Sequence, residues 1–194
     1  MHDALSRQHG LMTVAEFLDW PGDGTGRRFE LVDGELRPMS PSRPIHGRIQ
    51  SKLCRLVDEA LEAAGSPCQV VCDPGVITAR HAHINMRVPD LGVTCTPDAP
   101  EHRALPDPVV LIEILSPSNA VDTWDNVWAY TTIPSVREIA VVHSTRVAAE
   151  LLRRDADGGW PAQPEQIDAD GTLRLESIAF PCPLRAAYAQ THLG

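Results

Sequence analysis

Lysine is almost missing from this sequence. The chain has 194 residues and 17 basic side chains, of which Lys52 is the single lysine. Any chemistry that requires a lysine therefore has one candidate. The basic residues face 26 acidic ones, a formal net charge of −9, which argues against a protein that coats nucleic acid by bulk attraction. A nucleic-acid enzyme is not excluded, because a divalent cation held by carboxylates reverses the local charge.

Long apolar runs are also absent. No stretch of about 18 apolar residues occurs, which excludes an ordinary membrane-spanning helix. Residues 1–7 contain no apolar segment of the kind found in secretory signals. We therefore expect a cytoplasmic protein with no membrane partner. Hydrophobic residues make up 43% of the chain and charged residues 22%, which predicts one globular domain over residues 1–194.

The cysteine count indicates reduced thiols. There are five cysteines, an odd number, and no secretion signal, so we expect free thiols in a reducing compartment. Cys68 and Cys72 lie four residues apart, but they form neither a CxxC motif nor half of a double pair. Zinc bound by these two residues, in a structural or metal-storage role, is the alternative.

Hydrophobic periodicity predicts a mixed α/β domain. Thr13 and Glu16 have the spacing of a capping box, and Asp33-Gly34 is a two-residue hairpin turn. Helices are expected at residues 14–20, 45–64, 122–131 and 184–190. Strands are expected at residues 28–32, 35–39, 69–78, 86–94, 109–115, 136–143, 147–153 and 173–175, with a turn at 79–85 and a loop at 96–108.

Two acidic residues stand where acids are unusual. Glu113 interrupts the apolar run 109–115, where an ionised carboxylate costs several kcal/mol unless it is paired, protonated or bound to a metal. Asp90 follows Pro89 in the neighbouring strand, at a position typical of an edge or bulge. Together they form a hard-oxygen site suited to Mg²⁺ or Mn²⁺. A salt bridge at Glu113 and a strand-end acid at Asp90 are the structural alternatives.

A basic stripe runs along the helix predicted at residues 45–64. Arg48, Lys52 and Arg55 share one face of it. Basic residues in the N-terminal half of a helix oppose its dipole, so the stripe can serve to contact nucleic-acid phosphates. A solvated face containing an Arg55–Glu59 pair is the alternative.

Six ordered segments carry a resemblance to a known family. Pro89-Asp90 followed by Glu113-Ile114-Leu115 resembles the PD-(D/E)xK nuclease signature, with its third position altered. More specifically, residues 12–153 resemble the Uma2 family (the DUF820 group) of restriction-endonuclease-like proteins. The matching segments are Arg28 through Leu36; Met39-Ser40-Pro41 followed by His46; Asp73-Pro74-Gly75-Val76; Val88-Pro89-Asp90-Leu91; Glu113 through Ser118; and Asp122 through Tyr130 into Ile133-Pro134.

The resemblance implies a restriction-endonuclease-like fold, with a central mixed sheet flanked by helices. It implies that Asp90, Glu113 and the main-chain carbonyl of Ile114 bind Mg²⁺ or Mn²⁺. Two further matching residues, Glu30 and His46, are expected near the active site, where they position water or support the ligands. Asp73 is a further candidate near the metal. Solvated, packing or turn roles are the alternatives for these last three residues.

The sequence departs from the family pattern at the catalytic lysine. Leu115 stands at the position where the nuclease signature has the lysine. Uma2-like proteins place that lysine instead in the following helix, at the position of Asn126 here. Asparagine can orient a water molecule, but it cannot supply positive charge to the transition state. The substitutes that the sequence offers are Lys52, Arg80 and Arg87.

The sequence predicts two alternative functions. The first is a metal-dependent endonuclease that hydrolyses DNA, weakened by Asn126 and acting as a homodimer, as restriction-like nucleases often do. The second is a non-catalytic module that keeps the nuclease fold and binds nucleic acid or a protein partner.

Overall fold

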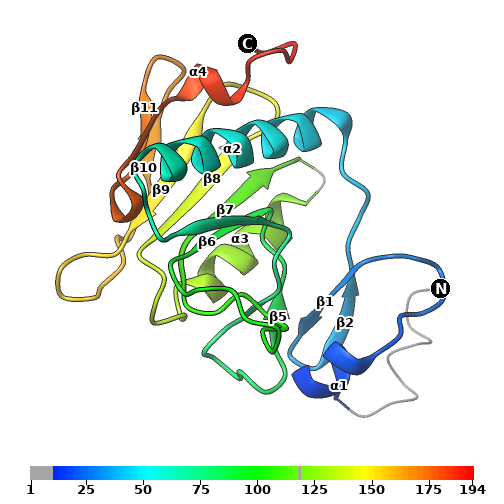
Figure 1. Ribbon diagram of the computed structural model, residues 1–194. Coiled ribbons are helices and arrows are strands. Elements are labelled where there is room, and N and C mark those ends of the chain that lie inside the picture. Colours follow the sequence, from blue (N-terminus) through cyan, green and yellow to red (C-terminus); the bar gives the residue numbers. More distant parts are fainter. Residues whose placement is uncertain (1–10, 118) are drawn as a thin grey trace.

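The computed structural model describes residues 11–117 and 119–194 (Figure 1). Its central sheet has six strands in the order β10-β9-β8-β7-β6-β3. Only β7 and β8 are parallel; all other neighbours are antiparallel. The strands are β3 (Gln69–Cys72), β6 (Leu91–Thr94), β7 (Pro108–Leu115), β8 (Glu138–His143), β9 (Ala149–Arg153) and β10 (Glu165–Ile167).

Helices cover both faces of this sheet, as expected. α2 (Pro44–Ala63) lies across one face, and α3 (Ala120–Tyr130) lies behind the strands on the other (Figure 1). Each helix packs its apolar stripe into a separate core, one holding Ile112 and Ile114 of β7 and the other holding Leu111. Side chains alternate along a strand, so Glu113 projects to the α3 face. No described helix combines the length and apolar character needed to cross a bilayer.

The C-terminal segment completes the α2 side of the molecule. It consists of β11 (Thr172–Leu175), a 3₁₀ turn (Glu176–Ile178), β12 (Phe180–Pro183) and α4 (Leu184–Ala187). These elements pack into the same core as α2. The sequence prediction missed β10, the 3₁₀ turn and β12, and it extended the last helix to residue 190.

A second, four-stranded sheet has the order β2-β1-β5-β4. Its strands are β1 (Phe29–Val32), β2 (Glu35–Pro38), β4 (Val76–Ile77) and β5 (Met86–Arg87), with α1 (Val14–Asp19) packed against them. The expected capping box of Thr13 and Glu16 is present. The hairpin is confirmed too: Asp33 and Gly34 both have positive φ, at 48° and 81°, as a primed two-residue turn requires.

The strands expected at 69–78 and 86–94 are each divided between the two sheets. One antiparallel register runs through both halves, pairing Gln69 with Thr94 and Val76 with Arg87. It is interrupted at Asp73-Pro74-Gly75 and Val88-Pro89-Asp90, where each proline lacks the N–H that a ladder needs. The prediction of two continuous strands was therefore wrong in extent, and the interruption places Asp90 between the sheets.

The prediction of five free thiols was wrong. Cys68 and Cys95 form a disulfide, which also excludes Cys68 from the alternative zinc pair. The two residues lie opposite each other, one position beyond the Gln69–Thr94 pair of β3 and β6. The other three cysteines are free: Cys54, Cys72 and Cys182.

Candidate functional site

Asp90 and Glu113 lie side by side at the edge of the β6–β7 ladder. The last ladder pair is Leu91 with Ile112, so the same antiparallel register puts Asp90 opposite Glu113. The backbone break before β6 supplies Asp90, and the buried central strand β7 supplies Glu113. The structure thus brings together the two acids that the sequence singled out, on adjacent strands.

The protein holds one oxygen of the Asp90 carboxylate. Its Oδ2 accepts a hydrogen bond from the Ile114 N–H at 2.6 Å and lies 3.2 Å from His46 Nε2. The side chain remains 14% exposed. In a strand, the N–H and C=O of one residue project to the same side, so the Ile114 carbonyl also projects toward Asp90. The geometry therefore suits Ile114 as a main-chain ligand.

Glu113 is buried and short of compensating charge. Tyr130 of α3 donates its hydroxyl proton to Glu113 Oε1 at 2.7 Å. Burial raises the pKa of Glu113 well above its usual value of 4.5, and the negative charge of Asp90 raises it further. Burial likewise raises the pKa of Tyr130, so Tyr130 stays a neutral donor. Two crowded carboxylates of this kind stabilise a cation placed between them.

A second network joins the second sheet to α3 and to the backbone break through Glu30. Its Oε1 accepts from the Val88 N–H at 2.9 Å and from Asn126 Nδ2 at 3.0 Å. Its Oε2 accepts from Arg37 Nε at 3.0 Å and also from Arg37 Nη2. The same Nη2 donates to Asn126 Oδ1. Glu30, Arg37 and Asn126 thus form a closed ring of hydrogen bonds.

Arg37 is the site residue that sequence reasoning missed. It lies directly opposite Glu30 in the β1–β2 hairpin. The two-residue turn at Asp33-Gly34 fixes that pairing, so the sequence did contain a signal for the ion pair. No sequence signal indicated that Asn126, 89 residues further on, would join it.

His46 and Asp73 lie beside the acids in different ways. His46 is buried in the first turn of α2, and its Nδ1 has no partner among the described residues. Asp73 has partners at both carboxylate oxygens: Gln50 Nε2 at 2.8 Å on Oδ1 and Arg28 Nη1 at 2.9 Å on Oδ2. Gln50 also donates to the Asp90 carbonyl at 2.9 Å. Asp73 thus supports the backbone break, and its place near a metal stays a prediction.

The donor set fits a small, hard cation bound in an open site. Across residues 11–117 and 119–194, no cluster of three or more His, Cys, Asp or Glu side chains is arranged to hold a metal. Asp90 and Glu113 instead provide two carboxylates, each with one oxygen held by the protein. Mg²⁺ in phosphoryl-transfer sites is bound by one or two carboxylates, with waters and substrate phosphates completing the shell. The residues present fit that arrangement.

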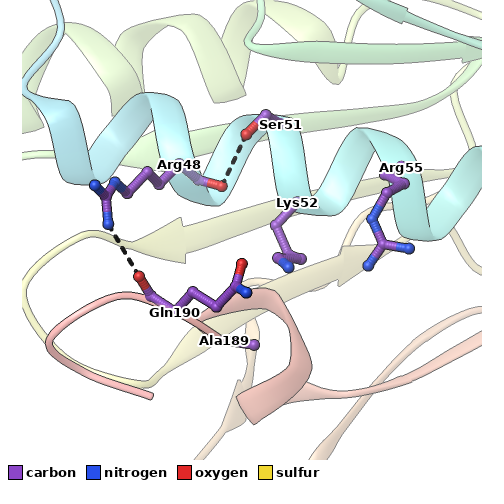
Figure 2. Close-up of a pocket in the computed structure, with 6 residues that line it drawn as sticks. All are labelled: Arg48, Ser51, Lys52, Arg55, Ala189 and Gln190. Atoms are coloured by element: carbon purple, nitrogen blue, oxygen red, sulfur yellow. Dashed lines mark hydrogen bonds between the residues drawn. The ribbon is translucent and has the colours of Figure 1, made fainter.

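The predicted basic stripe lines a groove on the flank of α2 away from Gln50 and Asp73. Figure 2 shows Arg48, Lys52 and Arg55 projecting from the helix toward Ala189 and Gln190 of the C-terminal segment. The groove has a volume of about 600 Å³. Arg48 donates to the Gln190 carbonyl at 3.0 Å. The expected Arg55–Glu59 pair is present as well.

Comparisons with known proteins agree with the fold. The Uma2 family model, described as "Putative restriction endonuclease", matches residues 14–183. Uncharacterized protein slr1290 of Synechocystis sp. (strain ATCC 27184 / PCC 6803 / Kazusa) is 28% identical over 171 residues, which is 87% of this chain and 87% of that protein. A crystal structure from Anabaena variabilis ATCC 29413, titled "a putative nuclease belonging to DUF820", matches with a TM-score of 0.71.

That structural match covers 92% of this chain and 98% of the other, at 18% identity, and so it shows a shared fold. The family model covers far more than half of the chain, from before β1 to the end of β12. The resemblance found in the sequence is thereby confirmed, and the chain belongs to the Uma2 family.

Proposed function

We propose that the protein is a metal-dependent endonuclease that hydrolyses phosphodiester bonds of DNA. One observation carries the proposal: the β6–β7 register puts Asp90, one residue before β6, opposite Glu113 of β7, and each carboxylate has one oxygen held by a protein donor. Asp90, Glu113 and the Ile114 carbonyl would hold Mg²⁺ or Mn²⁺. The bound ion would polarise the phosphate and lower the pKa of the attacking water.

The neighbouring residues prepare this site. The Ile114 N–H and the Tyr130 hydroxyl orient the two carboxylates. His46 lies against Asp90 and is positioned to accept or return a proton there. Glu30 holds Asn126 and the Val88 backbone, which fixes the second sheet to α3 and to the segment that carries Asp90.

The groove along α2 supports DNA as the substrate. Arg48, Lys52 and Arg55 provide three cations on one helix, in a protein that is otherwise acidic. Basic side chains of this kind bind backbone phosphates, and such contacts position a duplex without reading its sequence. His46 and Gln50 beside Asp90 belong to the same helix as the groove, so α2 would link DNA binding to the catalytic acids.

Plasmid cleavage tests the proposal. Supercoiled DNA is incubated with Mg²⁺, Mn²⁺ or EDTA and with wild type, Asp90→Asn, Glu113→Gln and the exposed control Asp98→Asn. We expect nicked or linear product from wild type and Asp98→Asn with metal, and at least about 10²-fold less from the two site variants.

An alternative function rests on Asn126, which leaves the family's lysine position uncharged. No cleavage by wild type with either metal, together with salt-sensitive DNA binding, would overturn the proposal in favour of a non-catalytic binding module. Cleavage that persists in Asp90→Asn would show that the acids have been misassigned.

A further inference from the structure

We propose that Arg37 supplies the positive charge that the family pattern places at position 126, and that it contacts the scissile phosphate. The inference rests on the proposed nuclease function and adds a catalytic residue to it. It accounts for two features of the chain. Its single lysine, Lys52, lies on the flank of α2 away from the acids, and the position of the family's lysine, 126, holds asparagine.

The Arg37 guanidinium lies next to the side chain at position 126. Arg37 Nη2 donates to Asn126 Oδ1, so the guanidinium lies directly beyond the tip of the Asn126 side chain. A lysine at 126 would have a side chain long enough to reach the space that the guanidinium now fills. Both Asn126 and Arg37 also bond Glu30.

Asn126 connects this cation to the catalytic acids. It lies one helical turn before Tyr130, which donates to Glu113. Asn126 and Tyr130 are therefore neighbours on one face of α3. Arg37 is thus connected to Glu113 through two successive side chains of α3, Asn126 and Tyr130, a placement suited to stabilising negative charge that develops on a phosphate there.

One edge of the guanidinium remains available. Nε and Nη2 are committed to Glu30 and Asn126, whereas Nη1 donates to Asp122 Oδ1 at a longer distance, 3.4 Å. Asp122 is 61% exposed, and the Arg37 side chain is 24% exposed. A DNA phosphate is a stronger partner for guanidinium than such an exposed, loosely held carboxylate. Binding of substrate would replace the Asp122 contact.

Arg37 carries its charge despite partial burial. Burial alone would lower its pKa, but the charge of Glu30 and the hydrogen bonds to it outweigh that effect and raise the pKa. The cation is thus permanent, unlike a buried lysine, whose pKa shifts readily.

The three other candidate cations do not fit. Arg87 is only 6% exposed, and burial and the neighbouring Arg37 lower its pKa. Its Nη2 donates to Asn85 Oδ1 at 3.3 Å, on the interior side of the second sheet. Arg80 is exposed in the turn before β5, and Lys52 lines the α2 groove.

The test exchanges the cation between the two positions. Cleavage rates with Mg²⁺ are compared for wild type, Arg37→Gln, Asn126→Lys and the double variant Arg37→Gln/Asn126→Lys. Arg103→Gln is the control, because Arg103 is an exposed arginine paired with Asp19. We expect Arg37→Gln to lose about 10²–10³ in rate and the double variant to recover to within about tenfold of wild type. Recovery separates a missing charge from a missing fold, because a misfolded Arg37→Gln protein would not regain activity.

A second readout does not depend on turnover. The salt dependence of binding to a DNA duplex is measured in Ca²⁺ by fluorescence anisotropy. Losing one phosphate contact lowers the log–log slope by about 0.9, so Arg37→Gln should lower it and the double variant should restore it. An unchanged slope or an unchanged rate in Arg37→Gln overturns the inference.

The two proposals fail differently. If wild type is inactive but Asn126→Lys cuts, the nuclease site is present and Arg37 does not replace the lysine. If no variant cuts with any metal, the nuclease function falls. In that case the slope measured in Ca²⁺ still decides whether Arg37 contacts phosphate.

Discussion

The Glu30–Arg37 pair should be a large contributor to stability. Glu30 is 5% exposed and Arg37 is 24% exposed, so Arg37→Met leaves a buried carboxylate without its cation. Removing one partner of a buried pair costs about 3–5 kcal/mol. Glu30 keeps two hydrogen bonds, from Val88 and Asn126, which favours the lower end of that range. For a domain of this size, about 3 kcal/mol lowers Tm by roughly 6–12 °C.

A double-mutant cycle isolates the pair. Glu30→Gln removes the charge that Arg37→Met strands, so the double variant should be more stable than the two single costs predict, by about 1–3 kcal/mol. Urea unfolding at pH 7 in EDTA supplies all four free energies. Arg28→Met is the matched control, because Arg28 pairs with Asp73 while 53% exposed, and such a pair is worth about 0–1 kcal/mol.

Two results would refute the reasoning. One is a cost for Arg37→Met no greater than that for Arg28→Met. The other is additivity in the cycle, which would mean that Arg37 stabilises the fold through its alkyl chain rather than through Glu30. Either result would also weaken the case that the guanidinium is fixed beside Asn126.

Three further perturbations have defined outcomes. The pKa of Glu113 in the folded protein lies above 4.5. The contribution of Glu113 to the free energy of unfolding is therefore full below pH 4.5. It is lost, at about 1.4 kcal/mol per pH unit, as the pH rises from there through the folded-state pKa. In EDTA, Glu113→Gln should abolish that loss, and parallel unfolding curves between pH 5 and 8 would contradict this. The disulfide closes a separation of 27 residues, so dithiothreitol should lower wild-type stability by about 3 kcal/mol and should not affect a Cys68→Ser/Cys95→Ser variant. The three cations of the α2 groove are Arg48, Lys52 and Arg55. Changing all three to glutamine should lower the log–log slope of DNA affinity against salt concentration by about 2–3. An unchanged slope would exclude the groove from the DNA interface.

Local patterns predicted the elements that carry the site. The apolar run around Glu113 predicted a doubly covered strand, because an alternating sequence would have indicated one solvated face. Asp33-Gly34 predicted the β1–β2 hairpin and its register, since few residues tolerate two consecutive positive φ values. Glu113 was found because it stands where a carboxylate is costly, and Asp90 because it follows a proline in the neighbouring strand.

Local sequence patterns did not predict the strand break or the disulfide. The hairpin formed by residues 69–94 has one register throughout, and pattern analysis recovered its two arms. What it did not recover is that Pro74 and Pro89 occupy opposite arms at the same level, which divides the ladder between two sheets. The same register sets Cys68 opposite Cys95, yet counting cysteines and judging the compartment predicted only free thiols.

The relocated cation explains why the lysine search failed. The substitutes predicted from the sequence were Lys52, Arg80 and Arg87, whereas the structure brings Arg37 of β2 to Asn126 across 89 positions. Adding a lysine at 126 while Arg37 is still present has an electrostatic cost. Glu30 is the carboxylate that bonds both Asn126 and Arg37, and Arg87 already lies close enough to Arg37 to lower its own pKa. Asn126→Lys in the wild-type background would place a third cation beside that carboxylate. The single variant should therefore be less stable than wild type, and the same lysine should become favourable once Arg37 is removed. A lysine that is harmful beside Arg37 and beneficial without it would mean that the two residues occupy one functional position.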